Sequence, residues 1–166
     1  VAVLASHTVM RTAVMGEAGS ERPASPDELT TMLSMFREAM AAGAVGLGSS
    51  ANENHRGAGG VPIASRLAHD DEFRAFAEVM KEFDHGVFMM TCGEHHGIPF
   101  LEELSSLSDK ASFYAPLFHY GHQPDRAMNI VNAAADARGR GVPVSAQGSC
   151  QPLSLSFTLD HAYLLK

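Results

Sequence analysis

The sequence predicts an α/β fold of parallel βα repeats, either a complete doubly wound sheet or part of a (β/α)8 barrel. Short apolar runs alternate with segments of helical periodicity along most of the chain. The apolar runs are nearly continuous, as in strands buried on both faces of a parallel sheet. A length of 166 residues with 45% apolar composition is enough for one buried core.

The first half of the chain begins with an apolar run, Val1 to Ala5, that predicts a strand ending in Ser6 and His7. Ser25 is a helix N-cap followed by Pro26 and, at the third helical position, Glu28, so a helix is expected to begin here. Its apolar residues recur at helical spacing until Gly43: they are Leu29, Met32, Leu33, Phe36 and Met40. A second strand is predicted over 44–48, followed by a glycine-rich loop to about residue 68.

The second half begins with a helix whose apolar stripe is Phe73, Phe76, Ala77 and Met80. The remaining predicted elements are a strand at 86–91, a helix at 101–107, a strand at 111–118, a helix at 125–138 and a strand at 142–147. Residues 152–166 show no clear period. The resulting order, β-α-β-α-β-α-β-α-β, fits a five-stranded doubly wound sheet or a consecutive section of a barrel, which normally needs about 250 residues.

Charge and composition exclude several functional classes. Twelve Lys and Arg against nineteen Asp and Glu give a net charge of −7, and without a basic stripe no nucleic-acid partner is expected. No run approaches the roughly 20 apolar residues that cross a bilayer, and no leader segment precedes the first strand. Two cysteines are too few for a disulfide scaffold. We therefore expect a cytoplasmic protein that has no membrane partner.

Candidate functional residues are sought at the carboxyl ends of the strands, where both architectures place their sites. Six of the nine histidines lie at or just past these ends: His7, His55, His95, His96, His119 and His122. Ser49 and Ser50 end the second strand, and Cys92 follows the third.

Each of these residues also has a simpler structural interpretation. His7 alone at a strand end is most simply a hydrogen-bonded structural residue, and His95 and His96 form a solvated pair in a polar loop. Cys92 after an apolar run is by default a small buried hydrophobe. His69, His85 and His161 are expected at the surface.

His119 is the strongest candidate metal ligand, because an imidazole at a strand tip is rigidly placed for zinc. His122 is three residues away and could be a second ligand in the same loop. The sequence contains no HxH pair, HExxH helix, GxSxG elbow, phosphate-binding GxxxxGK[ST] loop or GxGxxG fingerprint.

Four segments resemble the N-acyl-D-amino-acid deacylase (D-aminoacylase) branch of the amidohydrolase superfamily. ASHTVMRTAVMG at 5–16 resembles the pattern GHxxLRxxVMG, and a Pro-x-Glu-Leu helix start follows at 26–29. EAMAAGAVGLGSS at 38–50 resembles EALxAGAxGFSTG. VPIASRLAHDDEFRAFAEVM at 61–80 is similar to VPTxxAxxEELxxLAxxx, and the resemblance weakens toward about residue 153.

This resemblance implies that residues 1–166 are a single incomplete segment of an amidohydrolase barrel, covering about strands 3–7 of a (β/α)8 TIM-type barrel. The HxH pair of the family would lie upstream and its catalytic Asp downstream. The sixth-strand metal ligand matches His119, whereas the fifth-strand position falls in 90–92, where no His stands. Cys92, His95, His96 and His122 are possible helpers. Zinc is implied for the intact protein but is not expected in this segment alone.

The implied function is metal-dependent hydrolysis of a non-peptide C–N amide bond, such as that of an N-acyl (D-)amino acid. A metal-bound hydroxide would attack the carbonyl of a small-molecule amide, in a pocket whose mouth is lined by Ser49, Ser50 and His55 and braced by His7. This segment is expected to be inactive alone and to self-associate, covering the open edges of its sheet. Two alternatives stay open: a divergent zinc-free barrel relative that binds a ligand, and an independent flavodoxin-like binding module.

Overall fold

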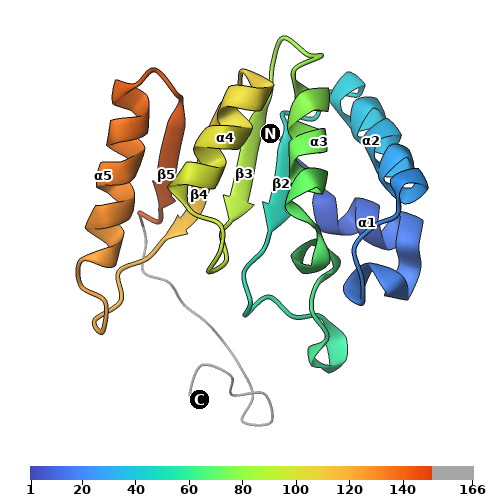
Figure 1. Ribbon diagram of the computed structural model, residues 1–166, viewed down its shortest axis with the longest axis horizontal. Helices are drawn as coiled ribbons and strands as arrows, with labels where there is room; N and C mark the ends of the chain where they lie inside the picture. Colours follow the sequence, from blue (N-terminus) through green and yellow to red (C-terminus); the bar gives the residue numbers. More distant parts are fainter. Residues whose placement is uncertain (151–166) are drawn as a thin grey trace.

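The computed structural model describes residues 1–150, which form one five-stranded sheet with helices between its strands (Figure 1). The strands are β1 (Ala5–Ser6), β2 (Leu47–Ser50), β3 (Val87–Thr91), β4 (Ala111–Leu117) and β5 (Val144–Gly148). The helices are α1 (His7–Met15), α2 (Pro26–Ala41), α3 (Asp70–Met80), α4 (Ile98–Ser108) and α5 (Arg126–Gly139). The aperiodic stretch 152–166, with His161, lies outside the described residues.

The strand order is sequential, β1-β2-β3-β4-β5, and every neighbouring pair is parallel. Each helix from α1 to α5 packs against the next, and together they cover one side of the sheet (Figure 1). Right-handed crossovers between successive neighbouring strands place all their helices on the same face. This arrangement confirms the predicted barrel segment and excludes the flavodoxin-like module, which needs a doubly wound order with helices on both faces.

Helix α2 begins where the sequence predicts. The Ser25 hydroxyl accepts a hydrogen bond from the backbone N–H of Glu28 at 3.3 Å, and the Glu28 carboxylate accepts one from the Ser25 N–H at 2.7 Å. This reciprocal capping box satisfies two backbone donors that the first helical turn leaves without partners. Pro26 at the first helical position needs no such partner.

The N-terminal prediction is wrong in one respect: the first strand covers only Ala5–Ser6, and helix α1 follows it at once. His7 is therefore the first residue of a helix and not the tip of a strand. The Ser6 hydroxyl caps the helix by accepting from the Val9 N–H at 3.4 Å. Val1 and Val3, predicted to be buried in a strand, are exposed.

The other differences are shifts of element boundaries. Strand β2 begins three residues later than predicted, after Gly46, whose φ of 141° favours glycine. Helix α4 begins three residues earlier, with Pro99 in its first turn. The long loop after β2 contains two short 3-10 turns, at Ala58–Gly60 and Ala64–Leu67.

The two faces of the sheet differ because side chains alternate along each strand. One face packs against the helices, and its residues are buried: they include Leu47, Phe88, Met90, Tyr114 and Val144. The predicted stripe of α3 covers this face, and Phe73, Phe76, Ala77 and Met80 are fully buried. The opposite face carries no helix, and its central row, Gly48, Met89, Phe113 and Ser145, is half-buried. We refer to this surface as the open face.

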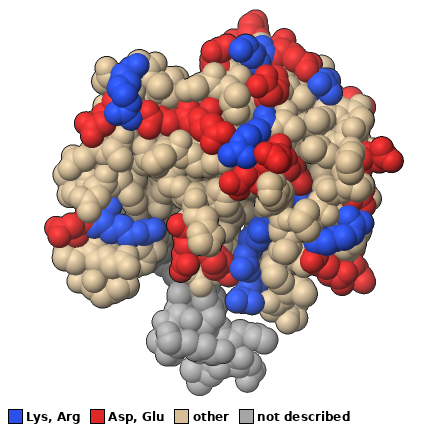
Figure 2. Space-filling view, in the orientation of Figure 1, with Lys and Arg blue, Asp and Glu red and all other residues tan. Residues whose placement is uncertain are grey.

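The surface over the helices mixes the two signs of charge. In Figure 2, Lys and Arg side chains lie among Asp and Glu, without a continuous basic area on the side shown. Several of these neighbours are ion pairs, such as Arg37 with Glu82 and Arg74 with Glu103. Within residues 1–150, no helix has both the length and the apolar composition needed to cross a membrane.

Candidate functional site

A cavity of about 980 Å³ opens at the carboxyl edge of the sheet, beside the ends of β3 and β4 and the first turns of α4 and α5. This is the edge at which the sequence predicts a site. Three of the predicted residues line the cavity, namely Cys92, His96 and His122. Ser49, Ser50, His55, His95 and His119 are not among its lining residues.

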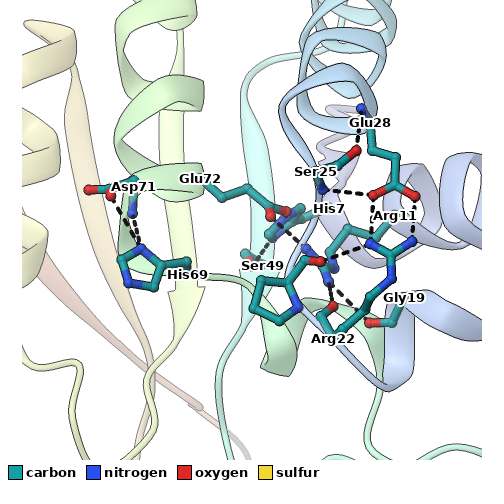
Figure 3. A network of polar contacts seen from close by, with 11 residues as sticks. His7, Arg11, Gly19, Arg22, Ser25, Glu28, Ser49, His69, Asp71 and Glu72 are labelled. Atoms are coloured by element: carbon teal, nitrogen blue, oxygen red, sulfur yellow. Dashed lines mark hydrogen bonds and ion pairs between the residues drawn. The ribbon is translucent and has the colours of Figure 1, made fainter.

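Ser49 lies on the helix-packed face of β2 and belongs to a buried polar network with His7, Arg11 and Glu72 (Figure 3). Its hydroxyl is 2.8 Å from His7 Nδ1, and His7 Nε2 is 2.6 Å from Glu72 Oε1. An ionised carboxylate only accepts hydrogen bonds, so we assign the proton of His7 to Nε2. Nδ1 then accepts from the Ser49 hydroxyl.

In the network of His7, Arg11, Glu72 and Ser49, the first three residues are buried and Ser49 is half-buried. Arg11 donates to Glu72 Oε2 at 2.5 Å, and the side chains of His7 and Arg11 are fully buried. The rings of Phe73 and Phe76 pack edge-on against the imidazole at centroid distances of 5.2 and 5.1 Å. A serine, a histidine and an acid hydrogen-bonded in this order can activate the serine hydroxyl for catalysis. Here the three side chains instead connect β2, α1 and α3 beneath the helices. His7 is thus the structural residue that the simpler interpretation predicts.

Electrostatics support a neutral His7 beside a charged Glu72. Burial lowers the pKa of His7, and its contacts with Glu72 oppose this shift without cancelling it. Burial by itself would raise the pKa of Glu72, but hydrogen bonds and charge from His7 and Arg11 bring it below its usual value. The buried ion pair is therefore Arg11 with Glu72, and His7 links it to Ser49.

Ser50 and His55 form a hydrogen-bonded pair that connects the end of β2 to the loop after it. The Ser50 hydroxyl accepts from the Asn52 N–H at 3.3 Å and lies 2.7 Å from His55 Nδ1, to which it can donate its own hydrogen. Partial burial, followed by the charge of Arg66, lowers the pKa of His55, which favours the neutral ring that such a bond requires. Ser50 is buried and His55 is exposed, so only His55 is free to meet a molecule from solution.

The other four candidate histidines, His95, His96, His119 and His122, do not form a common site. His96 Nε2 is 2.9 Å from Asp70 Oδ1, and its ring packs against Phe73 and Phe100. His95, His119 and His122 are exposed. The rings of His122 and Tyr120 are tilted against each other at a centroid distance of 5.7 Å, whereas His119 lies two residues beyond the end of β4.

Cys92 is a poor metal ligand as it stands. Its side chain is buried and its thiol lies 3.8 Å from the carbonyl oxygen of Met90, to which it donates. Burial raises the pKa of this thiol to about 12, and it is the thiolate that binds metals. Within the described part of the chain, no three His, Cys, Asp or Glu side chains lie close enough to hold a metal ion. The described residues therefore do not fit the complete zinc site of the resemblance.

The sequence did not predict two further residues of the cavity, Tyr114 and Arg126. The Arg126 guanidinium donates to the Tyr114 hydroxyl at 3.1 Å and lies over the Tyr120 ring at 5.2 Å. Tyr114 sits inside an apolar strand segment and therefore suggests only a core residue. The single signal for Arg126 is its position just after the loop that contains His119 and His122.

Comparison with solved structures finds a similar fold in part of two deacylases. A D-aminoacylase described for its binuclear metal centre has a TM-score of 0.67 and 17% identity over 86% of this chain and 28% of its own. N-acyl-D-glutamate deacylase from Bordetella bronchiseptica, complexed with zinc and a phosphonate inhibitor, has a TM-score of 0.67 and 18% identity over 87% of this chain and 29% of its own.

No protein-family model and no curated protein sequence matches this chain. The chain spans less than a third of the length of the solved structures that it resembles. At this level of identity, the likeness shows the fold alone, a segment of a (β/α)8 barrel.

Proposed function

We propose that this chain is part of a metal-dependent amidohydrolase that hydrolyses a non-peptide C–N amide bond, such as that of an N-acyl (D-)amino acid. The observation that carries this proposal is the sequential parallel sheet, which matches D-aminoacylase structures over 86% of the chain. The motif resemblance at 5–16 and 38–50 supports it independently of the fold. Both cysteines are free thiols, in keeping with the cytoplasm as the proposed compartment.

In the proposed enzyme, His119 supplies one zinc ligand and residues outside 1–150 supply the others. His119 makes no hydrogen bond or ion pair within the described residues, so its imidazole is free for this role. His55 would border the substrate, since it is exposed next to Ser50 at the end of β2. Ser49 and His7 would stabilise the sheet below without touching the substrate.

A second candidate function is a zinc-free barrel relative that binds a ligand. The observation in its favour is the chemistry at the end of β3, where Cys92 keeps its proton and no histidine occupies 90–92. Such a protein would use the same edge of the sheet for recognition alone.

The two candidates are separated by assays on a protein that contains this chain within a complete barrel. We expect this protein to hydrolyse N-acyl amino acids and to contain zinc, which plasma mass spectrometry measures. His119→Ala should lower the zinc content and the rate together by more than tenfold. His85→Ala is the matched control, because His85 is exposed and pairs with Asp84 away from this edge.

Two results would count against the proposal. Hydrolysis with a zinc content that His119→Ala leaves unchanged would show that the ligand assignment is wrong. Ligand binding without bound zinc and without hydrolysis of any amide would favour the second candidate.

A further inference from the structure

Arg126 is a cation without an anionic partner in the lining of the cavity. Most arginines of the helix surface are paired with carboxylates, as Arg37, Arg74 and Arg140 are. Arg126 makes no ion pair within residues 1–150, although Glu53, Glu94 and Asp125 line the same cavity. Its guanidinium is half-buried and keeps donors available beyond the single bond to Tyr114.

Tyr114 holds this guanidinium and adds a donor of its own. Its side chain is only 6% exposed and lines the cavity. The hydroxyl oxygen accepts from Arg126, which leaves the hydroxyl hydrogen for another acceptor. Burial raises the pKa of Tyr114, so the hydroxyl remains a donor at neutral pH. Tyr120 beneath the guanidinium restricts it further by a cation–π contact.

The rest of the wall limits which anion fits. Apolar side chains also line the cavity, with Ile98 at the start of α4 and with Ile130 and Ala133 in the second turn and just beyond it on α5. Three carboxylates in the same lining disfavour a doubly charged ligand more than a singly charged one. A short aliphatic chain with one carboxylate satisfies both conditions, because a guanidinium fork binds a planar carboxylate through two parallel hydrogen bonds.

We propose that the cavity between α4 and α5 is a binding site for a small monocarboxylate, with Arg126 and Tyr114 as the donors to the carboxylate and the two isoleucines around its aliphatic chain. This site lies on the helix-packed face of the sheet, since Tyr114 and Cys92 both belong to that face. All the residues named for it are among those described. The inference is argued from these residues alone and does not rest on the proposed function.

Calorimetric titration of this chain with butyrate tests the site, with butyramide as the uncharged isostere and inorganic phosphate as the alternative anion. We expect butyrate to bind more tightly than either. Arg126→Gln should weaken butyrate binding about 10–100-fold, the range of a charged hydrogen bond, and leave butyramide binding unchanged. Tyr114→Phe should weaken butyrate binding about 3–10-fold.

Arg138→Gln is the matched control, because Arg138 is an exposed arginine on the same helix and its side chain bonds, among the described residues, only the Ser145 hydroxyl. It should leave butyrate binding unchanged, and circular dichroism should show that all three variants keep the fold. Equal butyrate affinity in the wild type and Arg126→Gln would overturn the proposal. Tighter binding of phosphate than of butyrate, or equal losses in Arg126→Gln and Arg138→Gln, would overturn it as well.

Discussion

Replacing Glu72 by glutamine tests whether the buried network of His7, Arg11, Glu72 and Ser49 stabilises the fold. Glutamine keeps the size of the side chain but removes the charge opposite Arg11, whose side chain is fully buried. Arg11 would keep its bonds to the carbonyl oxygens of Gly19 and Arg22, at 3.2 and 2.9 Å. Its Nε atom is buried and has no partner among the described residues. Within these residues Arg11 pairs with no carboxylate other than Glu72.

The expected cost follows from the charge that is lost. Two charge-assisted hydrogen bonds end on Glu72, at 2.6 and 2.5 Å, and each is worth about 1.5–3 kcal/mol. Glutamine keeps one acceptor oxygen, so one of these bonds is lost and the other becomes uncharged. Breaking a buried ion pair by removing one partner costs about 3–5 kcal/mol. With a urea m-value of about 2 kcal/mol/M, a loss near 4 kcal/mol lowers the unfolding midpoint by about 2 M.

Urea unfolding followed by circular dichroism measures this shift, and Glu82→Gln provides the control. Glu82 binds Arg37 through two hydrogen bonds, but the two side chains are 47% and 45% exposed. Exposed pairs contribute at most about 1 kcal/mol, so the control should move the midpoint by no more than about 0.5 M. Equal shifts for the two variants would refute the reasoning. Replacing Arg11 and Glu72 together by methionine should recover part of the loss, since no buried charge remains.

Three further predictions concern the acid response, the glycine before β2 and the open face. Burial lowers the pKa of His7, so below pH 6.5, the ordinary pKa of histidine, the unfolded chain binds a proton at His7 that the folded chain does not. The urea concentration at the unfolding midpoint should therefore decrease as the pH is lowered from about 7.5 to about 5.5. An equally steep decrease in His7→Gln would contradict this. Gly46→Ala should cost at least about 2 kcal/mol, because its φ is 141° and a Cβ would meet the backbone of Val87. Gly43→Ala has a positive φ but open space and should cost less. The chain should self-associate through the open face, so Phe113→Glu should shift sedimentation toward monomer and the exposed-surface variant Met128→Glu should not.

Much of the fold was predictable because local signals and the apolar pattern agree. Ser25, Pro26 and Glu28 mark the start of α2, and the stripe from Phe73 to Met80 marks the buried side of α3. Helix α1 was missed because it follows its strand without a loop, so the apolar run masks the N-cap at Ser6. The motif resemblance identified the barrel segment, since periodicity alone fits two architectures.

The contacts of the site were less predictable, because they join residues distant in sequence. Asp70, Asp71 and Glu72 form an acidic first turn of α3 that suggests only a favourable helix dipole. Only Glu72 of these three is buried, and its partners lie 61 and 65 residues away. In the same way, Tyr114 in a strand and Arg126 at a helix start reveal their bond only once β4 and α5 are packed together.

The alternation of side chains along a parallel strand decides what each predicted site residue can do. Ser49 and Ser50 are adjacent, yet Ser49 faces the helices and bonds His7, whereas Ser50 lies opposite Thr91 and bonds His55. Cys92 and Tyr114 share the helix-packed face with Ser49. Ser50 is buried, so a substrate on the open face would meet the half-buried Thr91, and a carboxylate at Arg126 would occupy the other side of the sheet. Hydrolysis and butyrate binding should thus respond to different substitutions: Arg126→Gln should weaken butyrate binding about 10–100-fold and leave the metal content of the complete protein unchanged.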